Sequence, residues 1–144
     1  MNDVKPLTKL ILAVICLSLW PLAAETGNSV WTGIYTPEQA QRGRKVYADI
    51  CADCHMRALT GDGESQPLAG DRFLNHWEGE TVGTLFDRVR ITMPFIKPGT
   101  LSRQQVADVV AFVLYFNNFP SGKTELGTRA EALQQIRITA ARPH

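Results

Sequence analysis

The chain has 144 residues, with 15 Lys and Arg against 14 Asp and Glu, and 44% of its residues are hydrophobic. This length suits one small domain. The nearly neutral charge gives no reason to expect nucleic acid or an anionic membrane surface as a partner.

Residues 1–24 have the layout of a secretory signal peptide. Lys5 and Lys9 precede an apolar run over residues 10–22, and two alanines end the segment. The run is short for a membrane span, and an uncleaved N-terminal anchor is the alternative. Cleavage leaves 13 basic and 13 acidic residues. We therefore expect an exported, periplasmic protein that contacts the membrane only if this segment is retained.

Residues 25–35 predict an extended lead-in, and the first helix is expected directly after it. Thr36 suits the N-cap, Pro37 suits the first helical position, and Gln39 completes a Thr-x-x-Gln capping box. One face of this helix follows the helical period at Gly43, Val46, Tyr47 and Ile50. The helix leads straight into Cys51.

Cys51 and Cys54 are followed directly by His55, and this CxxCH pattern indicates covalent attachment of one haem. Each thiol can add across one vinyl group, and the adjoining imidazole is placed to ligate the iron. A thioredoxin-like redox pair would follow a strand in a βαβ unit, and the sequence shows no such alternation. A zinc site usually needs four ligands, and the Cys and His residues outside the motif are Cys16, His76 and His144. A disulfide would close a loop too short for much entropic gain.

The segment from Arg57 to Gly70 predicts a loop, because it is rich in glycine and contains a proline. Pro67 and Leu68 are candidates for the proximal edge of the haem. A backbone carbonyl near Pro67 would accept the Nδ1–H of His55 there and orient the ring. A plain surface loop is the alternative.

Two short helices are expected between this loop and residue 93. The first spans Asp71 to Trp77. Thr81 can cap the second, whose apolar positions follow the helical period at Val82, Leu85, Phe86 and Val89. Most of these side chains are expected to form ordinary core.

Met93 precedes Pro94 in a segment that predicts a loop able to present a thioether. Without the signal segment, the other methionine is Met56, which adjoins His55 and cannot reach the opposite face of the haem. Met93 is therefore the candidate sixth ligand of the iron. Two alternatives stay open: Met93 fills a gap in the core, or His76 ligates the iron in a bis-histidine centre.

The last long helix is expected from Ser102 to Asn117 and begins with a second capping box, formed with Gln105. The tail, residues 121–144, has the signal for one short helix that ends near Ile136. No strand alternation or internal repeat is present. The expected fold is all-α, with the folded domain over residues 36–120.

This order of features resembles the class I cytochrome c family, in particular its single-haem bacterial members. A capped helix enters CxxCH, and a Pro-Leu-Ala-Gly loop, a Met-Pro loop and a capped terminal helix follow. The resemblance implies that the first helix crosses the last near Gly43 and Tyr47. It also implies one covalent haem c, bound and ligated by Cys51, Cys54, His55 and Met93.

Two further stretches, Thr36–Ala40 and Asn118–Gly122, are similar to those of cytochrome subunits or partners of periplasmic dehydrogenases. No lysine cluster matches the docking rim of mitochondrial-type cytochromes. The implied function is one-electron transfer in a respiratory chain rather than catalysis, with a periplasmic dehydrogenase as donor and an oxidase or another cytochrome as acceptor. The alternatives are a cytochrome subunit of a larger dehydrogenase or oxidase complex, and a haem enzyme or sensor with an open iron.

Overall fold

The computed structural model of the chain describes residues 28–142, which fold into helices and turns without a strand. The helical elements are η1 (Val30–Thr32), α2 (Pro37–Ile50), α3 (Ala52–His55), α4 (Gly70–Trp77), α5 (Val82–Thr92), α6 (Arg103–Phe116) and α7 (Ala130–Leu133). The expected all-α class is confirmed for this part of the chain. None of its helices is long and apolar enough to cross a membrane. The predicted signal segment, residues 1–24, lies outside the described residues.

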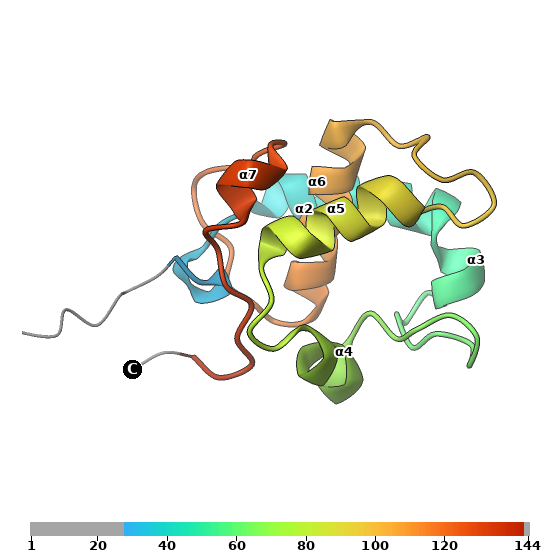
Figure 1. Cartoon of the computed structure of the whole chain (residues 1–144), viewed down its shortest axis with the longest axis horizontal. Helices are drawn as coiled ribbons and strands as arrows, with labels where there is room; N and C mark the ends of the chain where they lie inside the picture. The colour runs from blue at the N-terminus through green and yellow to red at the C-terminus, as the bar shows by residue number, and fades with distance from the viewer. Residues whose placement is uncertain (1–27, 143–144) are drawn as a thin grey trace, which may run out of the picture.

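Helices α2 and α6 cross at the centre of the fold (Figure 1). Gly43 permits their close approach, because a Cβ atom at this position would lie 1.8 Å from the carbonyl oxygen of Asp108. Tyr47 packs beside Phe112, with ring centroids 5.2 Å apart. The crossing is therefore present at the residues that the resemblance implied. Residues 106–114 of α6 are all buried, which explains why its apolar residues surround the helix.

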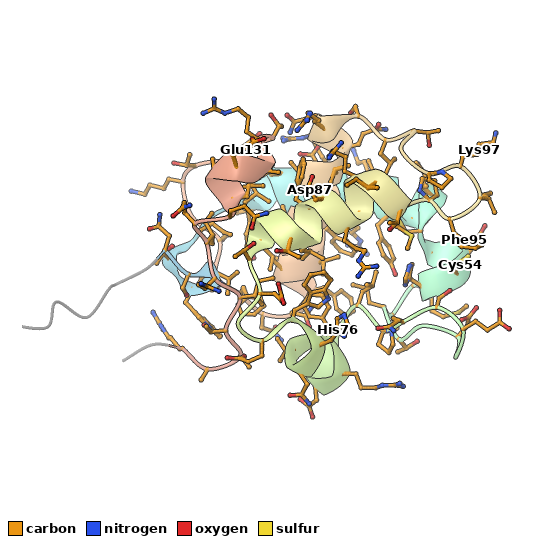
Figure 2. The ribbon with its side chains drawn as sticks, viewed as in Figure 1. Cys54, His76, Asp87, Phe95, Lys97 and Glu131 are labelled. Carbon is orange, nitrogen blue, oxygen red and sulfur yellow. The ribbon has the colours of Figure 1, made fainter. Side chains whose placement is uncertain are left out.

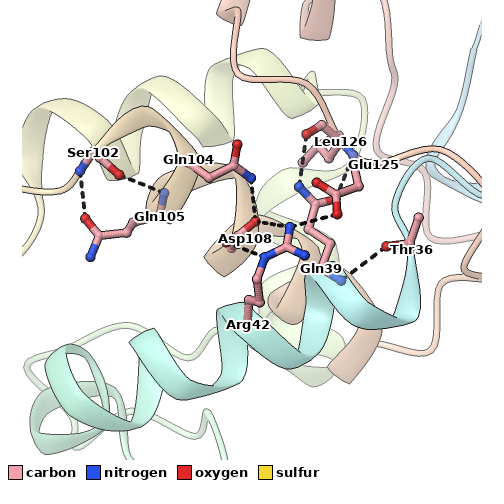
Figure 3. A network of polar contacts seen from close by, with 9 residues as sticks. All are labelled: Thr36, Gln39, Arg42, Ser102, Gln104, Gln105, Asp108, Glu125 and Leu126. Carbon is pink, nitrogen blue, oxygen red and sulfur yellow. Dashed lines mark hydrogen bonds and ion pairs between the residues drawn. The ribbon is translucent and has the colours of Figure 1, made fainter.

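Three helix starts predicted from the sequence are present. Thr36, Thr81 and Ser102 each accept a hydrogen bond from the backbone N–H three residues further on. At α6 the capping box is complete, since Gln105 Oε1 also accepts from the Ser102 N–H at 2.9 Å (Figure 3). Local sequence therefore determines where these helices begin.

The predicted capping box at the start of α2 is wrong in one half, because the side chain of Gln39 does not return to Thr36. Its Nε2 donates to the Leu126 carbonyl at 3.0 Å, and its Oε1 accepts from the Leu126 N–H at 2.6 Å (Figure 3). Gln39 is fully buried, so both ends of its amide need partners inside the protein. The backbone of the tail supplies both.

A network of charged groups also joins α2, α6 and the tail (Figure 3). Arg42 donates from Nε and Nη2 to the two carboxylate oxygens of Asp108, each at 3.1 Å, and from Nη2 to Glu125 at 2.9 Å. Asp108 is 4% exposed and also accepts from Gln104 Nε2 at 2.8 Å. The hydrogen bonds to Asp108 and then Glu125 raise the pKa of Arg42 above its usual value.

The lead-in differs from its prediction as an extended segment over residues 25–35. Its described part contains η1, which Ser29 caps by accepting a hydrogen bond from the N–H two residues on at 3.1 Å. Val30 and Tyr35 are fully buried, and the Tyr35 hydroxyl donates to the Phe119 carbonyl at 2.5 Å. Burial of these side chains pulls the lead-in onto the core, so the packed unit extends outside the predicted range 36–120.

The tail packs back on the domain through its described part, residues 121–142. Helix α7 is shorter than predicted and has no side-chain cap. The apolar residues around it are buried, namely Leu126, Ala130, Leu133 and Ile138. Backbone bridges then join Arg137 to Ser29 and to Thr81. The tail is thus an integral part of the core.

The two ends of the molecule differ in what they contain. Figure 1 shows η1 and α7 toward one end of the long axis, with α3 and the loop between α5 and α6 at the opposite end. The CxxCH motif therefore lies far from the lead-in and the tail.

Candidate functional site

The CxxCH residues occupy one tight turn at the end of α2. The N–H of Cys51 donates to the Tyr47 carbonyl at 2.9 Å and ends α2. The N–H groups of Cys54 and His55 then both donate to the Cys51 carbonyl, at 3.2 and 2.9 Å, and form α3. Both cysteines are free thiols, Cys51 half-buried and Cys54 exposed. One helical turn thus brings together two thiols and one imidazole.

The environment of Cys51 argues against a redox-active thiol pair. Burial, and then the neighbouring Cys54, raise the pKa of Cys51 to about 11, so its thiol is neutral at physiological pH. Reactive cysteines instead have lowered pKa values. No group of three His, Cys, Asp or Glu side chains in the described residues could hold a metal ion. The zinc interpretation therefore gains no further ligands from this part of the chain.

His55 has a hydrogen-bonded ring. Its Nδ1 lies 2.9 Å from the carbonyl oxygen of Gln66. A carbonyl can only accept, so Nδ1 carries a proton, and Nε2 is the ring nitrogen that can ligate a metal. The acceptor lies one residue before Pro67, in the region where the sequence predicted it. An imidazole with this tautomer fits the role of an axial ligand to haem iron.

The loop after α3 is held against the helices on both sides. The Tyr47 hydroxyl donates to the Met56 carbonyl at 2.8 Å, and burial, with a smaller contribution from Cys51, raises the pKa of Tyr47. Leu59 is fully buried, and its carbonyl accepts from the Leu68 N–H at 2.8 Å. Pro67 and Leu68 are half-buried. Both therefore lie on the segment that carries the acceptor of His55.

Asn117 contacts the same segment, and sequence reasoning assigned it nothing beyond the end of a helix. Its Nδ2 donates to the Leu68 carbonyl, and its Oδ1 accepts from the Gly70 N–H, each at 2.9 Å. Asn117 and these partners are 47 and 49 residues apart, so no local pattern could have indicated the contact.

Met93 follows α5 at the end of the molecule that carries α3. Its N–H donates to the Val89 carbonyl at 3.0 Å, and its carbonyl accepts from the Gly99 N–H at 3.2 Å, which closes a short loop. Met93 is half-buried. Figure 2 shows Phe95, on this loop, at the same end as Cys54.

His76 has a different setting. It is an exposed residue of α4, apart from the end that carries Cys54 (Figure 2), and its ring meets that of Trp77 edge-on, with ring centroids 5.4 Å apart. The structure thus places Cys54 and the Met93 loop at one end, and His76 on a separate helix.

The apolar side chains around the site suit a large apolar cofactor. Phe95 and Ile96 are 82% and 85% exposed beside Met93. Ile91 precedes Met93 on α5, Ile50 precedes Cys51 on α2, and both are exposed. Exposed apolar side chains next to functional residues are candidates for a binding surface. The two thiols, the His55 imidazole and these apolar side chains are of the types that suit a haem.

A surface hollow of about 360 Å³ lies elsewhere, at the end of α6, between Tyr35, Tyr115 and Phe119. It contains none of the CxxCH residues. We therefore assign the candidate site to α3 and the Met93 loop.

Comparison with protein-family models places this site within a matched family domain. The family model described as cytochrome C oxidase, cbb3-type, subunit III matches residues 38–113, a range that includes CxxCH and Met93. Among solved structures, the chain is similar to the sulfane dehydrogenase SoxCD from Paracoccus pantotrophus, with 25% identity and a TM-score of 0.49, over 85% of this chain and 68% of that chain. No curated protein matches.

Proposed function

Because the chain belongs to the family described as cytochrome C oxidase, cbb3-type, subunit III, and is a class I c-type cytochrome, we propose that it is an exported one-electron carrier. Cys51 and Cys54 hold one haem c through thioether bonds, and His55 and Met93 ligate its iron. The observation that carries this proposal is the hydrogen bond from His55 Nδ1 to the Gln66 carbonyl, which leaves Nε2 available to the iron.

Each ligating residue has a separate task. The thiols of Cys51 and Cys54, on one turn of helix, fix which face of the macrocycle His55 covers. The Gln66 carbonyl keeps the His55 ring in one orientation and raises its donor strength. The Met93 thioether favours the ferrous state relative to a second histidine. When bound, the haem supplies a ferric/ferrous couple that accepts one electron from a donor protein and gives it to an acceptor.

Electron exchange requires a partner to approach the haem edge. Phe95 and Ile96 are the most exposed large apolar side chains of the described residues, and they lie beside Met93. A small apolar contact suits the weak, transient encounters of redox proteins. We propose a periplasmic dehydrogenase as donor and an oxidase or another cytochrome as acceptor, both docking at this end of the molecule.

A second candidate is a permanent cytochrome subunit of a larger dehydrogenase or oxidase complex. Tyr115 and Phe116 favour it, because they are 58% and 39% exposed at the hollow away from the CxxCH motif. A second apolar surface would allow one partner to remain bound while the other end exchanges electrons. Purification of the native protein from its source at low salt tests this candidate: stable co-elution with a larger redox subunit supports it, and a monomeric cytochrome contradicts it.

The proposed ligation is tested by absorption spectra of the exported protein, oxidised and reduced. A c-type spectrum with the weak near-infrared band of a sulfur–ferric iron bond is expected. Met93→Ala should abolish that band, whereas Met56→Ala, the matched control, should retain it. A c-type spectrum without the band in the parent would contradict Met93 ligation and favour His76 or an open iron. Absence of covalent haem would refute the proposed function.

A further inference from the structure

The segment between α3 and α4, residues 56–69, carries the carbonyl group that orients His55. Gln66 itself is exposed, so its side chain does not anchor the segment in the core. The backbone bond from the Leu68 N–H to the Leu59 carbonyl, at 2.8 Å, closes the segment on itself. The buried Leu59 side chain and the bond from Tyr47 to the Met56 carbonyl anchor the start of the segment, so the stretch after Gln66 needs a contact of its own to be held against the helices.

Asn117 provides such a contact from the end of the central helix. Its Nδ2 donates to the carbonyls of Leu68 and Val113, each at 2.9 Å, and its Oδ1 accepts from the Gly70 N–H at 2.9 Å. One amide thus bonds the backbone on both sides of Ala69 and also bonds α6. Since α6 is the most deeply buried helix of the fold, this residue ties the loop to the rigid centre.

We propose that Asn117 is a positioning residue for His55, a role that rests on the proposed ligation of the haem iron by that side chain. The Gln66 carbonyl lies two residues before Leu68, which Asn117 holds. The intervening Pro67 has a fixed φ, which removes one of the torsions that could let Leu68 move without displacing the Gln66 carbonyl. Asn117 therefore controls the hydrogen bond to His55 Nδ1 without touching the ring.

This hydrogen bond affects the redox couple. Donation from Nδ1 to a carbonyl raises the basicity of Nε2, and a stronger donor stabilises ferric over ferrous iron. Loss of Asn117 should lengthen the hydrogen bond from His55 Nδ1 to the Gln66 carbonyl, and so make His55 Nε2 a weaker electron donor to the iron. The expected consequence is a higher reduction potential and faster exchange of the Nδ1 proton, with the iron ligands unchanged.

The experiment compares Asn117→Leu with Asn75→Leu in the full-length, haem-loaded protein. Asn75 is exposed on α4, so it controls for the same chemical change. Midpoint potential and exchange of the His55 Nδ1 proton by NMR are measured for both. For Asn117→Leu we expect the ferrous-to-ferric ratio at the parent midpoint to rise by up to about tenfold, which is a positive shift of up to about 59 mV for one electron. Asn75→Leu should match the parent.

Asn117→Gln keeps the amide and should recover part of the shift. If Asn117→Leu does not load haem, Asn117→Ser, which keeps one polar group at this position, supplies the same comparison. A lower melting temperature with unchanged potential and unchanged Nδ1 exchange would show a purely structural role and overturn the proposal. A parent without a c-type spectrum would instead overturn the proposed function, which the same sample reveals before any variant is made.

Discussion

The side chain of Gln39 and the backbone of Leu126 form a closed pair of hydrogen bonds, at 3.0 and 2.6 Å, between residues 87 positions apart. This amide clamp is buried and joins the first long helix to the tail. The donor and acceptor groups of both partners lack access to water, so a substitution that removes one partner leaves the other unsatisfied. The resulting loss of stability measures what the contact with the tail contributes.

Gln39→Leu should destabilise the protein by about 1–3 kcal/mol, because it leaves the N–H and carbonyl of Leu126 buried without partners. Chemical denaturation of the haem-loaded protein measures the change. Gln41→Leu, on the exposed side of α2, is the matched control and should change stability by less than about 0.5 kcal/mol. Equal effects of the two substitutions would show that the clamp contributes nothing.

Gly43→Ala should be among the most damaging small substitutions, because the new Cβ would lie 1.8 Å from the Asp108 carbonyl oxygen. Helices α2 and α6 would have to separate, at a cost of about 3 kcal/mol or more. Gly127→Ala is the control, since a Cβ there meets nothing within 4 Å. Yield of covalent haem and the unfolding midpoint should both fall for the first and not for the second. A normal midpoint for Gly43→Ala would refute the close crossing.

The two ion pairs of Arg42 should differ in strength, because Asp108 is buried and Glu125 is exposed. Asp108→Asn should cost about 1–3 kcal/mol, since it weakens charge-assisted bonds to Arg42 inside the protein. Glu125→Gln should lower the free energy of unfolding by less than about 1 kcal/mol at low salt, and high salt should remove this difference. Denaturation at low and high salt measures both, and a larger effect at Glu125 would contradict this ranking.

Alkaline pH should destabilise the fold through Tyr35. Burial raises the pKa of Tyr35 to about 12, against 10.0 for the free side chain. Between these values the unfolded chain loses the proton and the folded chain keeps it, so the contribution of Tyr35 to stability is constant below pH 10 and falls as pH rises toward 12. Tyr35→Phe should lower stability at neutral pH by about 1 kcal/mol, through loss of the bond to the Phe119 carbonyl, and make the alkaline decline shallower, with the remaining decline due to groups such as Tyr47, whose pKa burial also raises. An unchanged slope in the variant would contradict the assignment to Tyr35.

Local signals in the sequence predicted much of the fold. The caps at Thr36, Thr81 and Ser102 are present because each bond joins residues three apart, and such geometry depends on little beyond the local chain. The CxxCH motif is likewise contiguous, so its residues meet on one turn in any helical setting.

Two differences from the prediction involve partners that are distant in the chain. Gln39 had a plausible local donor in the backbone N–H of Thr36, but burial beside the tail offered its side chain two bonds in place of one. Asn117 ends a helix, as the Asn, Pro and Gly residues around it indicate. Its contacts with Leu68 and Gly70, however, depend on where the loop lies relative to the end of α6. Periodicity and composition carry no information about such pairings, which depend on tertiary approach.

The position of the amide clamp along the chain has a consequence for the order of events as the chain is synthesised and folds. A chain that emerges from its N-terminus presents Gln39 first, and Leu126 follows 87 residues later. Cys51, Cys54 and His55 lie between them, close to Gln39. The proposed thioether formation can therefore take place before these bonds between Gln39 and Leu126 form, and the tail can pack onto the core last.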